Sequence, residues 1–257
     1  MPLYIGTSGW QYDHWKELFY PRGLPLPDEL PYYAERFQTV ESNNAFYRLP
    51  ERRTFETWAR RTPDDFVMAV KVSRYLTHIK RLKEPKEPVE RFLARAAGLG
   101  PKFGPALLQL PPQLQLDIGR LQETLDQFPP TVRIAVEFRH DSWWTDDVRS
   151  VLERHGAALC LADRYRPIAP LWNTADWGYV RFHSGRAQPR GCYSRAALAD
   201  WVSRIAERWS PDADVFAYFN NDRHGCALRD AITFAELAAE AGLRPTRVPQ
   251  RSDLHLD

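Results

Sequence analysis

The chain has 257 residues, of which 44% are hydrophobic and 26% are charged, and its formal net charge at pH 7 is +2. This composition is typical of an ordinary globular protein, and the length suits one large domain or two small ones. The near balance of 35 basic and 33 acidic residues argues against strong electrostatic capture of nucleic acid, although it is compatible with a local basic patch.

The cysteines and the N-terminus bear on the cellular compartment. Cys160, Cys192 and Cys226 are odd in number, and none lies in a C-x-x-C pair. We therefore expect neither a disulfide framework nor a structural zinc site. The N-terminus lacks a basic segment followed by a long apolar one, and no apolar run approaches the length of a membrane span. These features predict a cytoplasmic protein without a membrane partner.

Short apolar runs alternate with amphipathic segments along the whole chain. Eight runs have the length and composition of strands: 3–5, 39–40, 66–72, 106–110, 132–136, 157–162, 178–182 and 215–219. Helical spacing of apolar residues begins at seven points: Asp28, Pro50, Pro88, Asp117, Thr145, Ser194 and Leu228.

This alternation predicts an α/β protein in which residues 1–257 form a single (β/α)8 TIM-type barrel. The sixth unit departs from the pattern. Residues 164–177 contain two prolines and no helical periodicity. We interpret this segment as a long loop that replaces the sixth helix.

Polar side chains follow every predicted strand, at the end of a barrel where active sites lie. In chain order they are Thr7, Ser8, Glu41, Asn43, Asn44, Lys71, Ser73, Gln109, Glu137, Arg139, Asp163, Arg181, His183, Asn220, Asn221 and Asp222. One such strand end would carry little information, because polar residues are common where strands enter loops. Eight together, with both signs of charge, predict a ligand site at the mouth of the barrel.

Seven motifs resemble those of the YecE-like family, also called domain of unknown function seventy-two. They are IGTSGWQYDHW (5–15), ESNNAFYRLP (41–50), VKVSRYLTH (70–78), LLQLPP (107–112), VEFRHDSW (136–143), YVRFH (179–183) and YFNND (218–222). The resemblance runs from residue 5 to about residue 242 and implies a TIM-type barrel. It implies no reaction, because the biochemical role of the family is not established.

The chemistry that we favour needs no metal. Lys71 could polarise a carbonyl or form a Schiff base, and Glu137 could act as a general acid or base if burial raises its pKa, with Glu41 as the third catalytic candidate. Arg139 and Arg181 could clamp a phosphate or carboxylate. The other substrate-binding candidates are Asn43, Asn44, Gln109, Asp163, His183, Asn220 and Asn221, with Trp10, Tyr47 and Trp144 as stacking surfaces. This set predicts a small anionic, polyhydroxylated or nucleotide-like ligand and hydrolase or isomerase/lyase chemistry.

Three alternatives stay open. Glu41, Glu137, Asp163 and Asp222 could hold Mg²⁺ or Mn²⁺ in a phosphodiesterase-like or endonuclease-like site, since hard cations prefer oxygen ligands. The mouth could also bind a nucleic acid without catalysis, with the phosphates on Lys80, Arg81, Lys83 and Lys86. A retaining glycosidase is disfavoured, because the fourth and seventh strands end in Gln109 and His183 rather than in carboxyl groups.

Overall fold

The computed structural model describes residues 1–163 and 169–255. The strands are β1 (Pro2–Thr7), β2 (Thr39–Ser42), β3 (Val67–Lys71), β4 (Phe103–Gln109), β5 (Ile134–Glu137), β6 (Ala158–Asp163), β7 (Gly178–Phe182), β8 (Val215–Phe219) and β9 (Arg244–Pro245). The α-helices are α1 (Glu29–Arg36), α2 (Asn44–Tyr47), α3 (Arg52–Arg60), α4 (Lys86–Ala96), α5 (Ile118–Leu125), α6 (Asp146–Arg154), α7 (Arg195–Arg208) and α8 (Cys226–Glu240). Each predicted strand overlaps an observed one.

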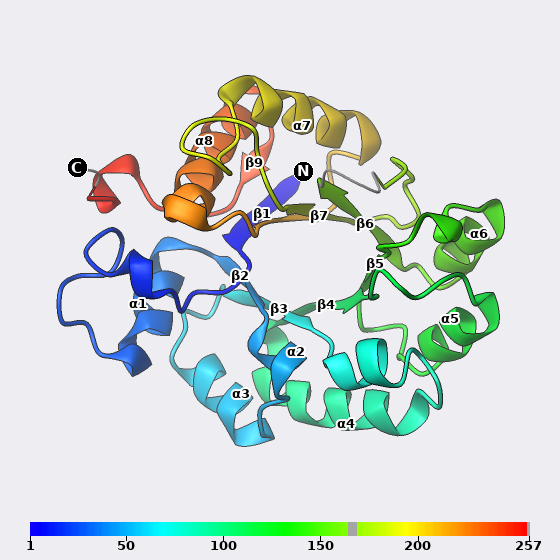
Figure 1. Cartoon of the computed structure of the whole chain (residues 1–257). Helices are drawn as coiled ribbons and strands as arrows, with labels where there is room; N and C mark the ends of the chain where they lie inside the picture. The colour runs from blue at the N-terminus through cyan, green and yellow to red at the C-terminus, as the bar shows by residue number, and fades with distance from the viewer. Residues whose placement is uncertain (164–168, 256–257) are drawn as a thin grey trace.

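The strands form one parallel sheet in the order β2-β3-β4-β5-β6-β7-β8-β1-β9. The sheet is curled, and the helices lie around its outside (Figure 1). Between β1 and β2 the structure has one isolated bridge, from Ser8 to Glu41, in place of a regular ladder. The predicted α/β class and parallel sheet are therefore confirmed, whereas regular pairing does not close the full eightfold barrel.

Side-chain caps explain several helix starts. Asp117, Thr145 and Ser194 each accept a hydrogen bond from a backbone N–H of the first turn, as predicted. The prediction for Asp28 is wrong, because its carboxylate accepts from Arg61 instead. The starts predicted at Pro50 and Pro88 are each displaced by two residues, since α3 begins at Arg52 and α4 at Lys86. The first turn of α4 tolerates Pro88 because its N–H groups lack partners within the helix.

The sixth unit has no helix between Ala169 and β7. This part of the predicted loop is confirmed, and the remainder, residues 164–168, lies outside the described residues. β9 was not predicted, because a two-residue strand leaves no periodic pattern in the sequence. It pairs with the start of β1.

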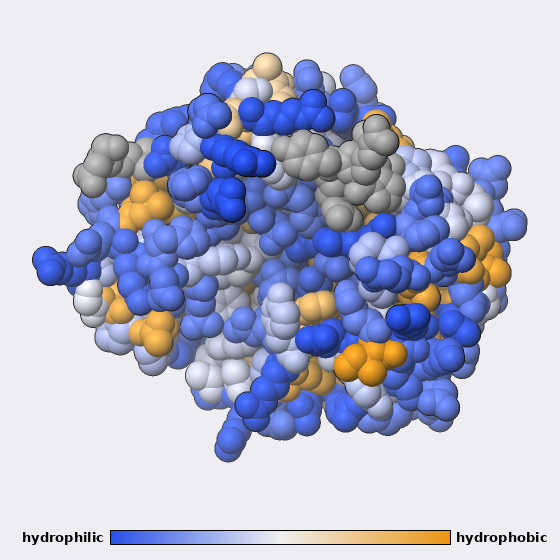
Figure 2. Space-filling view, in the orientation of Figure 1, coloured by the Kyte–Doolittle hydropathy of each residue, from blue (hydrophilic) through white to orange (hydrophobic). Residues whose placement is uncertain are grey.

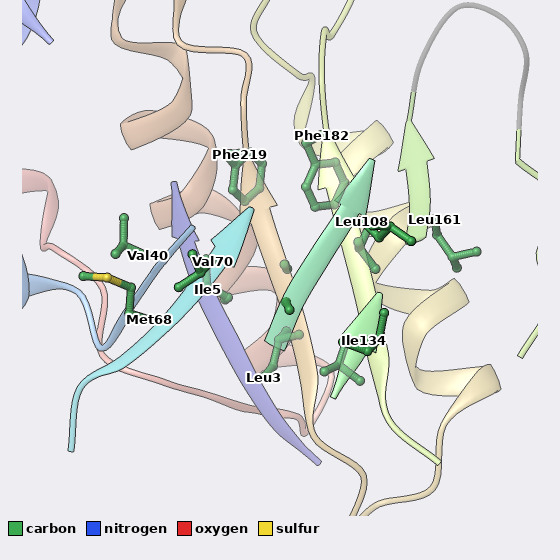
Figure 3. Close-up of a cluster of buried hydrophobic side chains, with 14 of the residues drawn as sticks. Leu3, Ile5, Val40, Met68, Val70, Leu108, Ile134, Leu161, Phe182 and Phe219 are labelled. Atoms are coloured by element: carbon green, nitrogen blue, oxygen red, sulfur yellow. The ribbon is translucent and has the colours of Figure 1, made fainter. Parts of the chain in front are cut away.

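Alternation along the strands separates two layers of side chains. The outward positions, such as Val70 on β3 and Leu108 on β4, pack against the helices in the main hydrophobic cluster (Figure 3). The inward positions form a second, smaller cluster that includes Ala69, Leu107 and Tyr218. This inner cluster mixes alanines with large aromatic side chains, such as those of Phe216 and Tyr218.

Candidate active site

Four charged side chains share the inward parity of this second cluster. Glu41, Lys71, Glu137 and Arg181 each lie two residues beyond an inward-facing position of their own strand, and all four are buried. Because successive side chains of a strand point to opposite faces, the same parity directs all four into the interior of the curled sheet. The strand pattern therefore brings Glu41, Lys71 and Glu137, which lie far apart in the sequence, close to Arg181.

Arg181 forms the centre of a buried ion network. Its Nη2 donates to Glu41 Oε1 at 2.7 Å, and its Nη1 donates to Glu137 Oε2 at 2.5 Å. The second oxygen of Glu41 accepts from the Tyr179 hydroxyl at 2.7 Å, and the second oxygen of Glu137 accepts from Arg139 Nε at 2.8 Å. Charged hydrogen bonds satisfy both carboxylates, so this layer forms a fixed floor.

Glu137 does not have the pKa that a general acid or base requires. Burial alone would raise the pKa of Glu137, but the charges of Arg181, His183 and Arg139 outweigh it and hold the pKa well below its usual range. The condition set for proton transfer by Glu137, a pKa raised by burial, is therefore not met. Glu137 is a carboxylate with occupied oxygens, which suits the orientation of the two arginines better than proton transfer.

Lys71 lies beside this network without joining it. Its ammonium lies 4.0 Å from the centre of the Phe46 ring, and among the described residues it has neither a hydrogen bond nor an ion pair. Burial, followed by the charge of Arg181, lowers the pKa of Lys71 to about 8. The amine is therefore mainly protonated at pH 7, but its neutral fraction is much larger than that of an ordinary lysine.

Above the floor lies an open cavity of about 630 Å³. Nine of the predicted site residues line it: Trp10, Asn43, Asn44, Tyr47, Lys71, Gln109, Arg139, Arg181 and Asn220. Its size is in the usual range for small-molecule sites. In the orientation of Figure 1, the surface over the strands is mainly hydrophilic, with scattered hydrophobic residues (Figure 2).

Several polar atoms at this cavity lack a partner. Ser8 Oγ, Asn43 Oδ1 and Arg181 Nε are buried and form no hydrogen bond with any described residue. An unpaired buried polar atom costs about 1–3 kcal/mol, so such atoms are uncommon in native proteins. Ser8, Asn43 and Arg181 all line the cavity, where a ligand or water could satisfy them.

Among the polar residues that line the cavity, sequence reasoning missed four: Gln11, Tyr12, Arg74 and His78. They lie three to seven residues beyond the ends of β1 and β3, where the prediction named Trp10 alone. His78 belongs to a short π-helix (Tyr75–Ile79), and its ring packs edge-on against Phe46 at 4.9 Å. Burial and the neighbouring charge of Lys71 lower the pKa of His78 to about 4, so its imidazole is neutral. The available signal for Arg74 and His78 was the family motif VKVSRYLTH (70–78), in which a helical turn directly follows the strand.

Six predicted site residues do not line the cavity, and two of them, Glu41 and Glu137, belong to the ion network of the floor. Asp163 has outward parity and accepts from Trp201 Nε1 of α7 at 3.0 Å. Asn221 donates to Asp230 at 2.6 Å, and Trp144 packs against Phe138 and Trp172. His183 lies beneath the cavity, with Nε2 at 3.4 Å from Glu137 Oε1.

The four carboxylates of the alternative metal site are not gathered at one point. Asp222 accepts from Trp15 Nε1 and pairs with His14, while Asp163 contacts α7. Glu41 and Glu137 both bind Arg181, which occupies the position that a cation would need. Within residues 1–163 and 169–255, no group of three or more His, Cys, Asp or Glu side chains could hold a metal ion.

Two of the three cysteines form a disulfide, contrary to the prediction. Cys192 lies between β7 and α7, and Cys226 begins α8, 34 residues further along the chain. Since β7 and β8 are neighbours in the sheet, the segments that follow them meet, and the two Cα atoms are 4.9 Å apart. The cytoplasmic prediction loses one of its supports, because disulfides persist mainly in oxidising compartments. Among the described residues, no helix is long and apolar enough to cross a membrane.

Comparisons with known proteins identify the family. The model of the family described as protein of unknown function DUF72 matches residues 4–253. A DUF72 family protein of Thermotoga maritima, TM1631, is 28% identical, with a TM-score of 0.80 over 93% of this chain and 100% of that one. Two structures of EF0366, a DUF72 family protein of Enterococcus faecalis, are 20% and 19% identical, with TM-scores of 0.78 and 0.73 over 92% of this chain and 95% and 97% of theirs. No curated protein matches the chain. The chain therefore belongs to the DUF72 family, which the YecE-like motifs had indicated.

Proposed function

We propose that the cavity at the strand ends binds a small anionic, hydroxyl-bearing compound and that the protein is an enzyme acting on it. The observation that carries this proposal is the convergence of basic and amide side chains, with unsatisfied polar atoms, on one cavity of ligand size. The proposal also takes the eight longer strands as a functional (β/α)8 barrel. The bridge between Ser8 and Glu41 supports that reading.

The charges at the cavity favour an anion. Lys71, Arg139 and Arg181 carry three positive charges when Lys71 is protonated, and Glu41 and Glu137 carry two negative charges, so this group has a net charge of +1. Arg74, which also lines the cavity, adds a further positive charge. Partial burial strengthens the attraction to a phosphate or carboxylate relative to that in water.

The uncharged polar groups suit hydroxyl recognition. Asn43, Asn44, Gln109 and Asn220 line the cavity with amide groups that can both donate and accept. The oxygen of Gln109 faces Arg139 at 3.2 Å, so its amide nitrogen is the end available to a ligand. The exposed ring of Tyr47 adds an apolar face on which a sugar or base could stack, whereas Trp10 is buried in the main hydrophobic cluster.

Among the reaction classes, isomerase or lyase chemistry has more support than hydrolysis. A hydrolase would need a general base or a metal to activate water, and the pKa of His78, lowered to about 4, makes its imidazole a weak base. Glu41 and Glu137 have their oxygens occupied by Arg181, Arg139 and Tyr179. The available reactive groups are the amine of Lys71, whose lowered pKa makes its neutral form accessible, and the neutral imidazole of His78.

Thermal-shift measurements on the purified chain test the proposal. Glycerol 3-phosphate is the probe, and glycerol and inorganic phosphate are its controls, each with and without Mg²⁺ or Mn²⁺. A ligand at about 100 times its Kd stabilises the folded state by about 2.7 kcal/mol, or roughly 5–10 °C for a chain of this size. The shift should vanish in Arg139→Gln and persist in Arg149→Gln, which removes an arginine of the α6 surface. Equal shifts in both variants would refute the assignment of the site.

Oligonucleotides in the same panel test the nucleic-acid alternative, for which binding should weaken steeply with salt. In the basic segment predicted for phosphate contacts, Lys80 pairs with Glu84 at 2.5 Å. This pair reduces the charge available to a nucleic acid. A shift with oligonucleotides alone would replace the small-molecule proposal.

A further inference from the structure

The chain has six lysines, and two of them are buried to the same extent. Lys71 and Lys102 each expose 8% of their surface. The ammonium of Lys102 donates to the carbonyl oxygens of Ala59 at 2.6 Å and Thr62 at 2.7 Å. That of Lys71 has no such acceptor among the described residues and faces the Phe46 ring instead. The two lysines are equally buried, but only the ammonium of Lys102 has hydrogen-bond acceptors. This contrast indicates that Lys102 is a structural residue and that Lys71 serves another purpose.

The surroundings of Lys71 favour a neutral amine. Every group that faces it belongs to the cavity or its floor: Arg181 and Arg139 oppose its charge, while Glu41 and Glu137 support it. The two carboxylates are bound to the arginines, and among the described residues neither forms an ion pair with Lys71. A buried amine without an anionic partner is the usual form of a lysine that acts as a nucleophile.

We infer that the Nζ of Lys71 is a nucleophile that forms an imine with the carbonyl group of a small anionic aldehyde or ketone. This inference rests on the proposed function, since it places the carbonyl compound in the same cavity. Arg139, Arg74 and the amide side chains would hold the anionic and hydroxyl groups of that compound. The position of Lys71 at the end of β3 holds its amine at the cavity wall.

The reaction balances without a redox partner. The lone pair of neutral Nζ forms a bond to the carbonyl carbon, and the π electrons of the carbonyl move to its oxygen. That oxygen gains a proton as the nitrogen loses one, which gives a carbinolamine. Its hydroxyl group then gains a proton and leaves as water while the nitrogen forms the C=N bond. The protonated imine attracts electrons from the adjacent carbon, which is the step that isomerases and lyases of this type require.

Reductive trapping tests the inference. The intact chain is incubated with pyridoxal 5′-phosphate, a small phosphorylated aldehyde, and reduced with sodium borohydride. Hydride addition converts the imine into a secondary amine, so the labelled peptide gains the mass of the aldehyde less one oxygen atom. Because the lowered pKa gives Lys71 a larger neutral fraction, we expect its labelling to be at least about 10-fold faster than that of exposed Lys83, which lies outside the cavity. Glycerol 3-phosphate should protect Lys71 and leave Lys83 unaffected.

Two variants keep the result interpretable. Lys71→Arg retains a positive charge and should lose the fast labelling, while Lys102→Arg should retain it. Circular dichroism of both variants checks that they fold. In wild type, the labelling rate should rise with pH through about 8, where Lys71 loses its proton, rather than near the usual value for lysine of about 10.4.

Each outcome decides between the two proposals. Fast, protectable labelling of Lys71 supports both. A thermal shift with glycerol 3-phosphate, without preferential labelling of Lys71, overturns the imine and leaves the anion site standing. Fast labelling that glycerol 3-phosphate does not reduce overturns the claim that the amine lies in the anion site. The absence of both effects overturns both proposals.

Discussion

Substitution of Glu137 by Gln tests the buried floor of the site, because it keeps the shape of the side chain and removes its charge. Glu137 is fully buried and binds Arg181 at 2.5 Å and Arg139 at 2.8 Å. Gln would direct an N–H group toward one of these guanidinium groups and leave its charge uncompensated. Breaking a buried ion pair from one side costs about 3–5 kcal/mol. At about 2–4 °C for each kcal/mol, the Tm should fall by roughly 6–20 °C.

The pH dependence of this difference has a defined sign. Burial alone would raise the pKa of Glu137, but Arg181, His183 and Arg139 hold it well below the value of about 4.3 expected for the unfolded chain. The stabilisation from its charge is therefore fully present above the unfolded value and is lost as the pH falls through the folded value. The gap in stability between wild type and Glu137→Gln should stay constant above pH 5 and shrink below about pH 4.

Scanning calorimetry of both proteins from pH 3 to pH 8 measures this gap. The matched control is Glu56→Gln, which breaks an exposed pair with Arg52 at 3.0 Å. Exposed pairs contribute about 1 kcal/mol or less, so this control should change the Tm little. A Glu137→Gln variant whose Tm lies within about 2 °C of wild type would refute the buried network as a source of stability.

Three further predictions concern stability. Lys71→Met should raise the free energy of unfolding at pH 7 by up to about 3 kcal/mol, and this gain should decline from pH 8 to pH 10. Lys102→Met should instead lower the free energy of unfolding by about 1–3 kcal/mol, because it removes two hydrogen bonds. Urea unfolding that gives both changes the same sign would contradict this contrast. Gly6→Ala would place a Cβ 2.3 Å from the Thr39 carbonyl oxygen, so it should lower the Tm far more than Gly119→Ala, whose Cβ has no neighbour closer than 3.7 Å. Equal Tm values for the two variants would rule out this close approach of β1 to β2. Reduction of the disulfide between Cys192 and Cys226 should cost about 4 kcal/mol for a closed loop of this length. An unchanged Tm in a chain whose three cysteines are all free thiols by mass spectrometry would disprove its contribution.

Strand alternation accounts for much of the difference between the predicted and observed site. Lys71, Gln109, Glu137 and Arg181 were predicted from their place at strand ends, and all share inward parity. Asp163 was predicted by the same rule, but it continues the outward positions of β6 and therefore faces α7. Applying the period of two to each strand end would have removed Asp163 from the set.

The sequence by itself determined the order of the elements and the end of the sheet at which polar groups gather. Apolar periodicity is a local property, and parallel strands place their carboxyl ends at one edge. Only the tertiary structure decided the partners of each group. It joined Arg181 to Glu41 and Glu137, left Lys71 unpaired, and brought Cys192 to Cys226. Burial and contact between distant segments fix charge states and pairings, and neither is encoded in the spacing of residues along the chain.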